Sequence, residues 1–211
     1  MDIDNIIKGN KRFRNTHFPE LAQRFDELVE NGQKPKILFI CCSDSRVVPD
    51  LIVDSKPGDL FVLRNIGNFV PPYKNDIEFH GSSAAIEYAV SVLEVEDIIV
   101  CGHSHCGACA SLYQDLKDEN DLIHVNKWLE LGKNAKVDIN INSLNDKKRA
   151  KVLRKTEKES IKYQLANLLT YPAVVRKMKL NKLSLHGWYY KIEDGTISYY
   201  HKKTDSFKNL K

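Results

Sequence analysis

The sequence has no apolar run of eighteen residues, the length that a membrane-spanning helix requires. Its first residues do not form a basic segment followed by an apolar one, so we expect no secretory signal peptide, no membrane partner and a cytoplasmic location. The five cysteines are an odd number, and in such a protein they are expected to be reduced rather than paired in disulfides. Their thiols are then free to bind metal.

Signatures of several other enzyme classes are also missing. There is no G-x-S-x-G nucleophile motif and no glycine-rich phosphate-binding loop. The net charge is only +4, and acidic residues interleave with the basic cluster at 147–162, which favours solvated helix faces over a nucleic-acid surface. With 211 residues, of which 42% are hydrophobic, the chain is long enough to bury the core of one domain.

Short apolar runs alternate with helical patterns along the chain. We expect four β-strands at 36–41, 60–64, 97–102 and 183–190, and a fifth at 196–201 that forms a hairpin with the fourth. Helices are expected at 3–14, 21–30, 78–93, 106–116, 121–133, 146–169 and, after Pro172, up to residue 179. The alternation predicts an α/β fold with a central, mostly parallel sheet of four strands, an antiparallel edge strand and helices packed around it.

We interpret residues 1–211 as a single domain, because no repeat and no linker composition divides it. Its parts follow one another along the chain: N-terminal helices at 1–34, a metal-site core at 35–115, a helical region at 116–182 and C-terminal strands at 183–211. The motifs that carry chemistry fall in the second part.

Two fragments place soft metal ligands at the ends of predicted strands. CCSDSR at 41–46 puts Cys42 after the first strand, and GHSHCG at 102–107 puts His103 and Cys106 after the third. Because parallel strands share one carboxyl edge, these side chains converge if the two strands are neighbours. Two thiolates and one imidazole suit zinc and leave the fourth tetrahedral position open. The sequence therefore predicts a zinc site with room for water.

The other cysteines are assigned to packing. Cys41 points to the opposite face of its strand from the ligand that follows it, and Cys101 and Cys109 are small apolar residues of core segments. His105 lies between two of the ligands and competes with His103 for the metal, but we favour a surface position for it.

Asp44 and Arg46 follow the first ligand at a spacing that a structural metal site does not need. Zinc with an open position lowers the pKa of its water, so that hydroxide is available near neutral pH. An ionised Asp44, held in a charge-assisted pair by Arg46, would accept a hydrogen bond from that hydroxide and so point its lone pair at the electrophile. An ordinary surface ion pair is the alternative. The residues thus indicate hydration of a small electrophile by zinc hydroxide.

These motifs resemble those of the β-class carbonic anhydrases. C-S-D-S-R is followed by G-H-S-x-C-G, and further similar stretches occur in the same order over about residues 30–115 and 183–197: GQKPKILFICCSDSRV, PGDLFVLRNIGN, VPPY, AAIEYAV and HGWYYKIEDG. The resemblance implies reversible hydration of carbon dioxide to bicarbonate and a proton. It also implies one zinc ion per subunit, held by Cys42, His103 and Cys106, with Asp44 and Arg46 as the catalytic pair.

The resemblance further implies a substrate pocket formed partly by a neighbouring subunit. The corresponding positions are Gln33, Phe61, Ile66 and Tyr88. The active unit would then be a homodimer or a larger homo-oligomer, with the N-terminal helices extending toward the partner. Core packing is the alternative for Phe61, Ile66 and Tyr88.

Two subtypes of that family differ in regulation. In the bicarbonate-inhibited subtype, a Trp three residues before the first zinc cysteine accompanies an Arg and a Tyr, and the aspartate moves onto zinc. Here Arg64 and Tyr190 are present, but Phe39 occupies the Trp position. We therefore expect the plant-type subtype, in which Asp44 is a metal ligand only if a closed resting form exists.

Two other functions stay open at this stage. One is a carbon disulfide or carbonyl sulfide hydrolase with the same fold. The other is a non-catalytic, zinc-stabilised binding module, which would use four strong protein ligands and would not need the Asp44–Arg46 pair. For export of the proton, the sequence offers His80, His105 and Tyr88 without ranking them.

Overall fold

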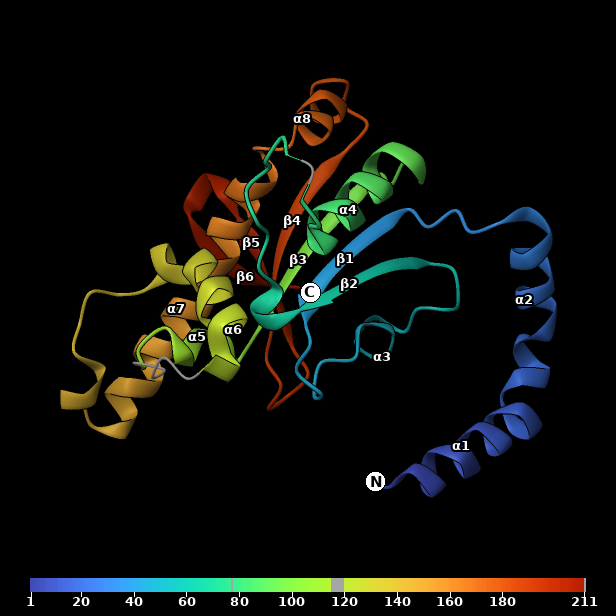
Figure 1. The fold of residues 1–211 in the computed structure, drawn as a ribbon, viewed down its shortest axis with the longest axis horizontal. Coiled ribbons are helices and arrows are strands. Elements are labelled where there is room, and N and C mark those ends of the chain that lie inside the picture. The colour runs from blue at the N-terminus through green and yellow to red at the C-terminus, as the bar shows by residue number, and fades with distance from the viewer. Residues whose placement is uncertain (77, 115–119, 211) are drawn as a thin grey trace.

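A six-stranded sheet forms the centre of the computed structural model, which describes residues 1–76, 78–114 and 120–210 (Figure 1). The strand order is β2-β1-β3-β4-β5-β6; the first four strands are parallel and the last two antiparallel. The strands are β1 (Ile37–Cys42), β2 (Leu60–Asn65), β3 (Asp97–His103), β4 (Ser184–Tyr190), β5 (Ile197–His201) and β6 (Ser206–Asn209). The predicted α/β fold is confirmed, with β6 as a strand that the sequence analysis missed.

Helices cover the sheet and extend from it. They are α1 (Ile3–Thr16), α2 (Phe18–Asn31), α3 (Pro49–Val53), α4 (Gly81–Glu87), α5 (Gly107–Ser111), α6 (Ile123–Leu129), α7 (Asp146–Leu168) and α8 (Pro172–Lys179). A π-helical segment, Tyr88–Val92, continues α4. The helix predicted at 106–116 is shorter than expected, and part of its range lies outside the described residues. Within the described ranges, no helix combines the length and apolar character needed to cross a bilayer.

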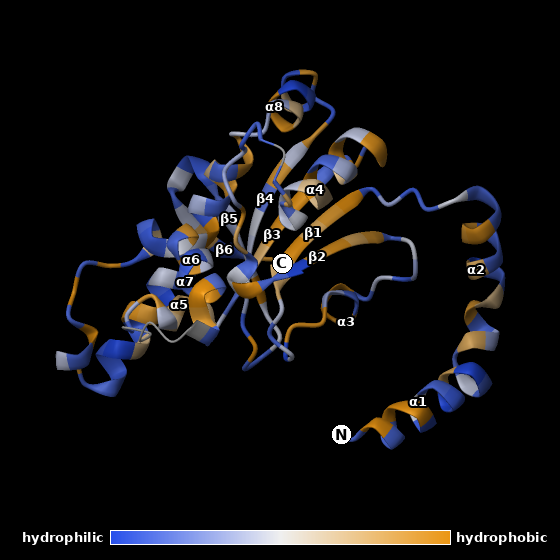
Figure 2. Cartoon of the chain, in the orientation of Figure 1, coloured by the Kyte–Doolittle hydropathy of each residue, from blue (hydrophilic) through white to orange (hydrophobic). Residues whose placement is uncertain are grey.

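The N-terminal arm, formed by α1 and α2, extends away from the sheet (Figure 1). Asp2 caps α1 by accepting a hydrogen bond from the Asn5 backbone N–H at 2.8 Å. No side chain of either helix is buried, and α1 exposes Ile3, Ile6 and Ile7 near its start, where Figure 2 shows hydrophobic colour. The arm therefore presents apolar surface that the body of this chain does not cover.

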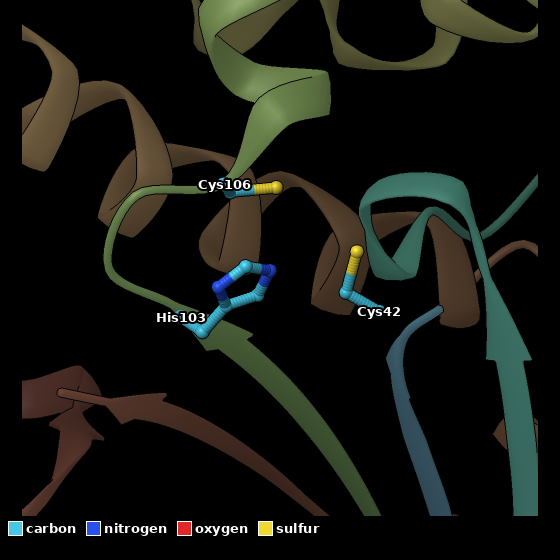
Figure 3. Close-up of side chains that lie close together, drawn as sticks. All are labelled: Cys42, His103 and Cys106. Atoms are coloured by element: carbon cyan, nitrogen blue, oxygen red, sulfur yellow. The ribbon is translucent and has the colours of Figure 1, made fainter. Parts of the chain in front are cut away.

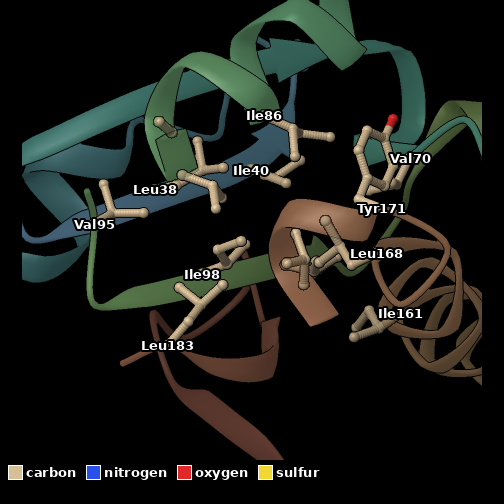
Figure 4. Packing of buried hydrophobic residues seen from close by; sticks show 14 of the residues in the cluster. Leu38, Ile40, Val70, Ile86, Val95, Ile98, Ile161, Leu168, Tyr171 and Leu183 are labelled. Atoms are coloured by element: carbon tan, nitrogen blue, oxygen red, sulfur yellow. The ribbon is translucent and has the colours of Figure 1, made fainter. Parts of the chain in front are cut away.

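The main core lies where α4, α7 and α8 cover one face of the sheet (Figure 4). Leu38 and Ile40 of β1 point to this face, because alternate residues of a strand share a side. Cys41 points to the other face and packs in a second cluster that also contains Cys101. The packing role predicted for these two cysteines is confirmed.

Two glycines allow α7 to approach the sheet closely. A Cβ atom on Gly102 of β3 would lie 2.7 Å from Cγ1 of Ile161. A Cβ atom on Gly187 of β4 would lie 2.8 Å from Cγ2 of the same isoleucine. Both distances are below ordinary carbon–carbon contact, so only glycine fits under this helix. The close approach brings the middle of α7 next to the carboxyl end of β3.

Candidate metal centre

Cys42, His103 and Cys106 meet at the carboxyl edge of the sheet (Figure 3). Cys42 ends β1 and His103 ends β3, and these strands are hydrogen-bonded neighbours. Cys106 follows as the N-cap residue of α5. The ligand atoms of the three side chains all lie within 4.8 Å of one another, and all three residues are buried. The three side chains therefore converge at the ends of neighbouring strands, as the sequence predicted.

The hydrogen bonds of His103 and Cys42 fit a metal ion. Nδ1 of His103 lies 2.8 Å from the Ser104 carbonyl oxygen, which only accepts, so Nδ1 carries the proton and Nε2 keeps its lone pair. Nε2 is buried and has no hydrogen-bond partner among the described residues, a costly state that a metal bond would relieve. The Gly67 N–H donates to Sγ of Cys42 at 3.3 Å, an interaction that favours a thiolate. This donor set fits zinc.

The two thiols would not ionise unaided. The hydrogen bond with Cys106, together with burial, raises the pKa of Cys42 to about 12. A hydrogen bond with Cys109 and burial place the pKa of Cys106 far above the usual thiol range. A divalent cation supplies the positive charge that makes thiolates favourable. The pocket thus favours charged sulfur only when a cation is bound.

Asp44 and Arg46 form a bidentate ion pair beside the three ligands. Nε of Arg46 donates to Oδ1 at 2.9 Å and Nη2 donates to Oδ2 at 2.8 Å, while the Arg46 backbone N–H also reaches Oδ1 at 3.0 Å. These bonds hold the pKa of Asp44 well below its usual range. The Asp44 side chain is only 15% exposed, which distinguishes the pair from an ordinary surface ion pair.

Arg64 supports the backbone between the ligand and the acid. Its Nε donates to the Cys42 carbonyl oxygen at 3.2 Å and its Nη2 donates to the Asp44 carbonyl oxygen at 2.9 Å. Arg64 therefore braces residues 42–44 in this structure.

Phe39, which occupies the position that separates the two subtypes, packs edge-on against Trp188. Their ring centroids are 6.1 Å apart, in a cluster that includes Tyr190.

An acid of α7 that the sequence did not indicate reaches the three ligand residues. Glu157 is 2% exposed, and its Oε1 accepts from the Cys106 backbone N–H at 3.2 Å and from Nη2 of Arg154 at 2.8 Å. The Tyr189 hydroxyl donates to Oε2 at 2.8 Å. Burial raises the pKa of Glu157 to about 7, against these hydrogen bonds and the charge of Arg154. Its position inside a highly charged segment gave no sign of burial, so the solvated face predicted there is wrong for Glu157.

A pocket of about 360 Å³ opens beside the metal cluster. It is lined by Ser43, Asn65 and Ile66 on one side and by His124, Val125 and Trp128 of α6 on the other. The Trp128 indole N–H donates to the Ile66 carbonyl oxygen at 2.7 Å, which links the two sides. Of the four predicted pocket residues, Ile66 lies near the Cys-His-Cys group of its own chain.

Phe61 and Tyr88 lie together but away from that cluster. Their ring centroids are 5.9 Å apart. Phe61 precedes Asn65, the register partner of Cys42, by four strand residues, a separation of about 13 Å along β2. Gln33 is exposed in the segment between α2 and β1. Within one chain these residues therefore do not surround the metal ligands.

His105 takes a surface position, as predicted. Its side chain is 53% exposed, and its Nε2 lies 2.7 Å from Oε1 of Glu193. Its backbone carbonyl oxygen accepts a hydrogen bond from Nη2 of Arg46 at 3.1 Å. His80 is similarly paired, with its Nε2 2.7 Å from Oδ1 of Asp76.

The fold and the donor set define a buried Cys-His-Cys group that could hold a metal ion at the carboxyl edge of a parallel sheet. Comparison with known proteins gives the family. A family model described as carbonic anhydrase matches residues 37–197. A carbonic anhydrase of Synechocystis sp. is 42% identical over 198 residues, covering 94% of this chain and 71% of that protein. One of Pseudomonas aeruginosa is 44% identical over 200 residues, covering 92% and 85%.

Solved structures agree. The β-carbonic anhydrase CcaA superposes with a TM-score of 0.85 at 40% identity, covering 99% of both chains. A β-carbonic anhydrase of Sordaria macrospora, described as tetrameric, gives a TM-score of 0.68 at 32% identity over 93% of this chain and 92% of that one. The chain belongs to the β-class carbonic anhydrase family and is, by that membership, a carbonate dehydratase.

Proposed function

We propose that this chain hydrates carbon dioxide reversibly at a zinc ion held by Cys42, His103 and Cys106. The observation that carries the proposal is the buried Nε2 of His103, which has no hydrogen-bond partner in the part of the chain that the structure describes and lies with two thiols within 4.8 Å. Bound zinc would supply an open coordination position and lower the pKa of water there. The described residues bring together three ligands rather than four, which favours this catalytic site over a zinc-stabilised binding module.

Asp44 is the hydrogen-bond acceptor that orients the attacking water in this proposal. Its depressed pKa keeps the carboxylate ionised across the neutral range, so it accepts a hydrogen bond from the attacking water and directs a lone pair toward carbon. Arg46 occupies both carboxylate oxygens and would thereby restrain Asp44 from binding the metal itself. This arrangement supports the open, plant-type subtype, with Asp44 as a zinc ligand only in a closed resting form.

The substrate pocket is proposed to be completed by a second copy of the chain. Ile66 lines the pocket beside its own metal ligands. Phe61 lies about 13 Å from Asn65 along β2, and Tyr88 packs against it, so both would serve the site of a partner, with Gln33 as the fourth pocket residue. The unburied arm supports a homodimer or a larger homo-oligomer. The cytoplasmic location stays a prediction.

Zinc content measured together with stopped-flow carbon dioxide hydration tests the proposal. We expect one zinc ion per wild-type chain and rapid hydration, and loss of both in Cys42→Ser. Cys41→Ser is the matched control, because Cys41 packs on the opposite face of the sheet. A zinc-loaded wild type whose hydration rate equals that of the zinc-free protein would contradict the proposal. Hydrolysis of carbon disulfide or carbonyl sulfide by that protein would then identify the alternative enzyme.

A further inference from the structure

We propose that Glu157 of α7 is a positioning residue of the metal centre, which fixes Cys106 by accepting the hydrogen bond of its backbone N–H. The inference rests on the proposed function in one respect, that Cys106 is a metal ligand. It assigns a role to the long charged helix, for which the sequence analysis found none.

The Cys106 N–H needs an acceptor from outside its helix. Cys106 is the N-cap residue of α5, and backbone N–H groups at the start of a helix have no partner within the helix. Oε1 of Glu157 accepts this N–H at 3.2 Å from a residue 51 positions further along the chain. The hydrogen bond therefore connects Cys106 to α7, the helix that packs on β3 and β4.

The carboxylate of Glu157 is itself held in place from two directions. Nη2 of Arg154, one turn earlier in α7, donates to Oε1 at 2.8 Å, and the Tyr189 hydroxyl of β4 donates to Oε2 at 2.8 Å. The α7 helix is seated by the glycines of β3 and β4 under Ile161. An acceptor fixed by two elements transmits that rigidity to Cys106.

A second set of contacts holds the loop between the two ligands. Glu193 accepts from the Ser104 hydroxyl at 2.5 Å and lies 2.7 Å from Nε2 of His105. Nη1 of Arg154 approaches the same Glu193 at 3.6 Å. The loop from Ser104 to Cys106 is thus held by Glu193, which follows β4, and by Glu157 of α7, and Arg154 links these two acids. Of these bonds, the one from Glu157 ends on Cys106.

Burying the carboxyl group of Glu157 costs desolvation free energy, and a residue that only filled space would not incur this cost. An acidic side chain that is 2% exposed must be fully hydrogen-bonded to be tolerated, whereas an apolar residue would fill the same space without that penalty. The carboxyl group at this position accepts three hydrogen bonds, one of which comes from the Cys106 backbone N–H. Supporting groups of this kind change metal affinity by about 10- to 100-fold when they are removed.

The test is the rate of zinc release to a chromophoric chelator from the zinc-loaded full chain. We expect release from Glu157→Ala to be about 10- to 100-fold faster than from wild type. Glu157→Gln should release zinc within about three-fold of wild type, because its amide oxygen replaces Oε1 and its NH2 group can donate to the Tyr189 oxygen. In cobalt-substituted protein, the thiolate-to-cobalt absorption band should change in the alanine variant and return in the glutamine variant.

Ser160→Ala is the matched control, since Ser160 is buried on the same helix one turn later and its hydroxyl has no partner among the described residues. Release from Glu157→Ala within two-fold of this control would overturn the inference. Release from Glu157→Gln as fast as from Glu157→Ala would also overturn it. If Glu157→Ala does not fold, Tyr189→Phe decides, because it removes only the donor to Oε2: a rise of about two- to five-fold supports the role, and an unchanged rate refutes it.

These readouts separate the inference from the proposed function. Zinc release and the cobalt spectrum depend on metal binding alone, so they report on Glu157 even if wild type fails to hydrate carbon dioxide. Rapid hydration by wild type, combined with unchanged release in the variants, would leave the proposed function intact and reject the role of Glu157.

Discussion

The guanidinium of Arg46 holds both carboxylate oxygens of Asp44, with Nε 2.9 Å from Oδ1 and Nη2 2.8 Å from Oδ2. Because both oxygens are engaged and the acid side chain is 15% exposed, the carboxylate has one orientation beside the metal ligands. The same arginine reaches the carbonyl oxygen of His105, on the loop that carries the other ligands. Through Arg46, the orientation of Asp44 is therefore linked to the position of the loop that follows His103.

Asp44→Asn should keep zinc and lose activity. The neutral amide is a weaker hydrogen-bond acceptor than the carboxylate, so it orients the attacking water poorly. Groups that act on the reacting proton contribute about 10²- to 10⁴-fold to rates, and we expect a fall of that size in the hydration rate. Stopped-flow hydration and metal analysis measure the two quantities. Asp54→Asn, an exposed acid ten residues further on, should change neither. An active, zinc-loaded Asp44→Asn would mean that the pair is only a surface ion pair.

Arg46→Ala should raise the pKa of Asp44 from its depressed value toward about 3.9. The sign follows because the arginine stabilises the ionised form. Asp44 stays ionised at pH 7 in both proteins, so activity lost there reports orientation rather than protonation. Carboxyl carbon NMR between pH 6 and pH 3.5 should show little titration of Asp44 in wild type and its onset in the variant. Arg46→Lys, which keeps charge without the bidentate geometry, should lie between them. Identical titration in all three proteins would contradict this account.

Gly67→Ala should disturb both stability and the metal site. Gly67 has φ +75°, and an added Cβ would lie 2.8 Å from Cβ of Ala108 and from Cζ of Phe69. Overpacking of this kind costs about 1–3 kcal/mol, beyond the backbone strain. Its N–H also donates to the Cys42 sulfur, so zinc content should fall.

Gly195→Ala provides the matched control for that change. Gly195 has φ +74°, but an added Cβ there would have no atom within 4 Å. Urea unfolding should therefore show only the strain of about 1–2 kcal/mol, with zinc content unchanged. Equal losses of stability in the two variants would show that crowding at Gly67 is unimportant.

Ile3→Glu combined with Ile7→Glu should weaken self-association. The two residues are four apart, share one face of α1 and are exposed in the single chain. Charges buried against a partner subunit would be costly, so sedimentation should shift toward smaller species. Asn5→Glu combined with Asn10→Glu adds the same charge at exposed polar positions, and this control should sediment like wild type. If the isoleucine variant sediments like wild type, the arm does not bind a partner through this face.

Local patterns were sufficient for much of the fold. The first three strands were predicted because Val, Ile, Leu, Phe and Cys form compact runs bounded by turn residues. β6 was missed because its sequence, SFKN, has one apolar residue, Phe207, and no alternation. Its strand conformation depends on pairing with β5, a long-range contact that no local pattern encodes.

The sequence by itself determined the chemistry of the site: which residues offer sulfur, imidazole, carboxylate and guanidinium groups, and that Cys42 and His103 follow strands. Tertiary structure decided how these groups meet. The adjacency of β1 and β3 brings the three ligands together, because neighbouring parallel strands share an edge. Packing of α7 on the sheet decided that Glu157, which looks solvated in a charged sequence, is buried against Cys106. Burial depends on what packs over a residue, and that is a property of the whole fold.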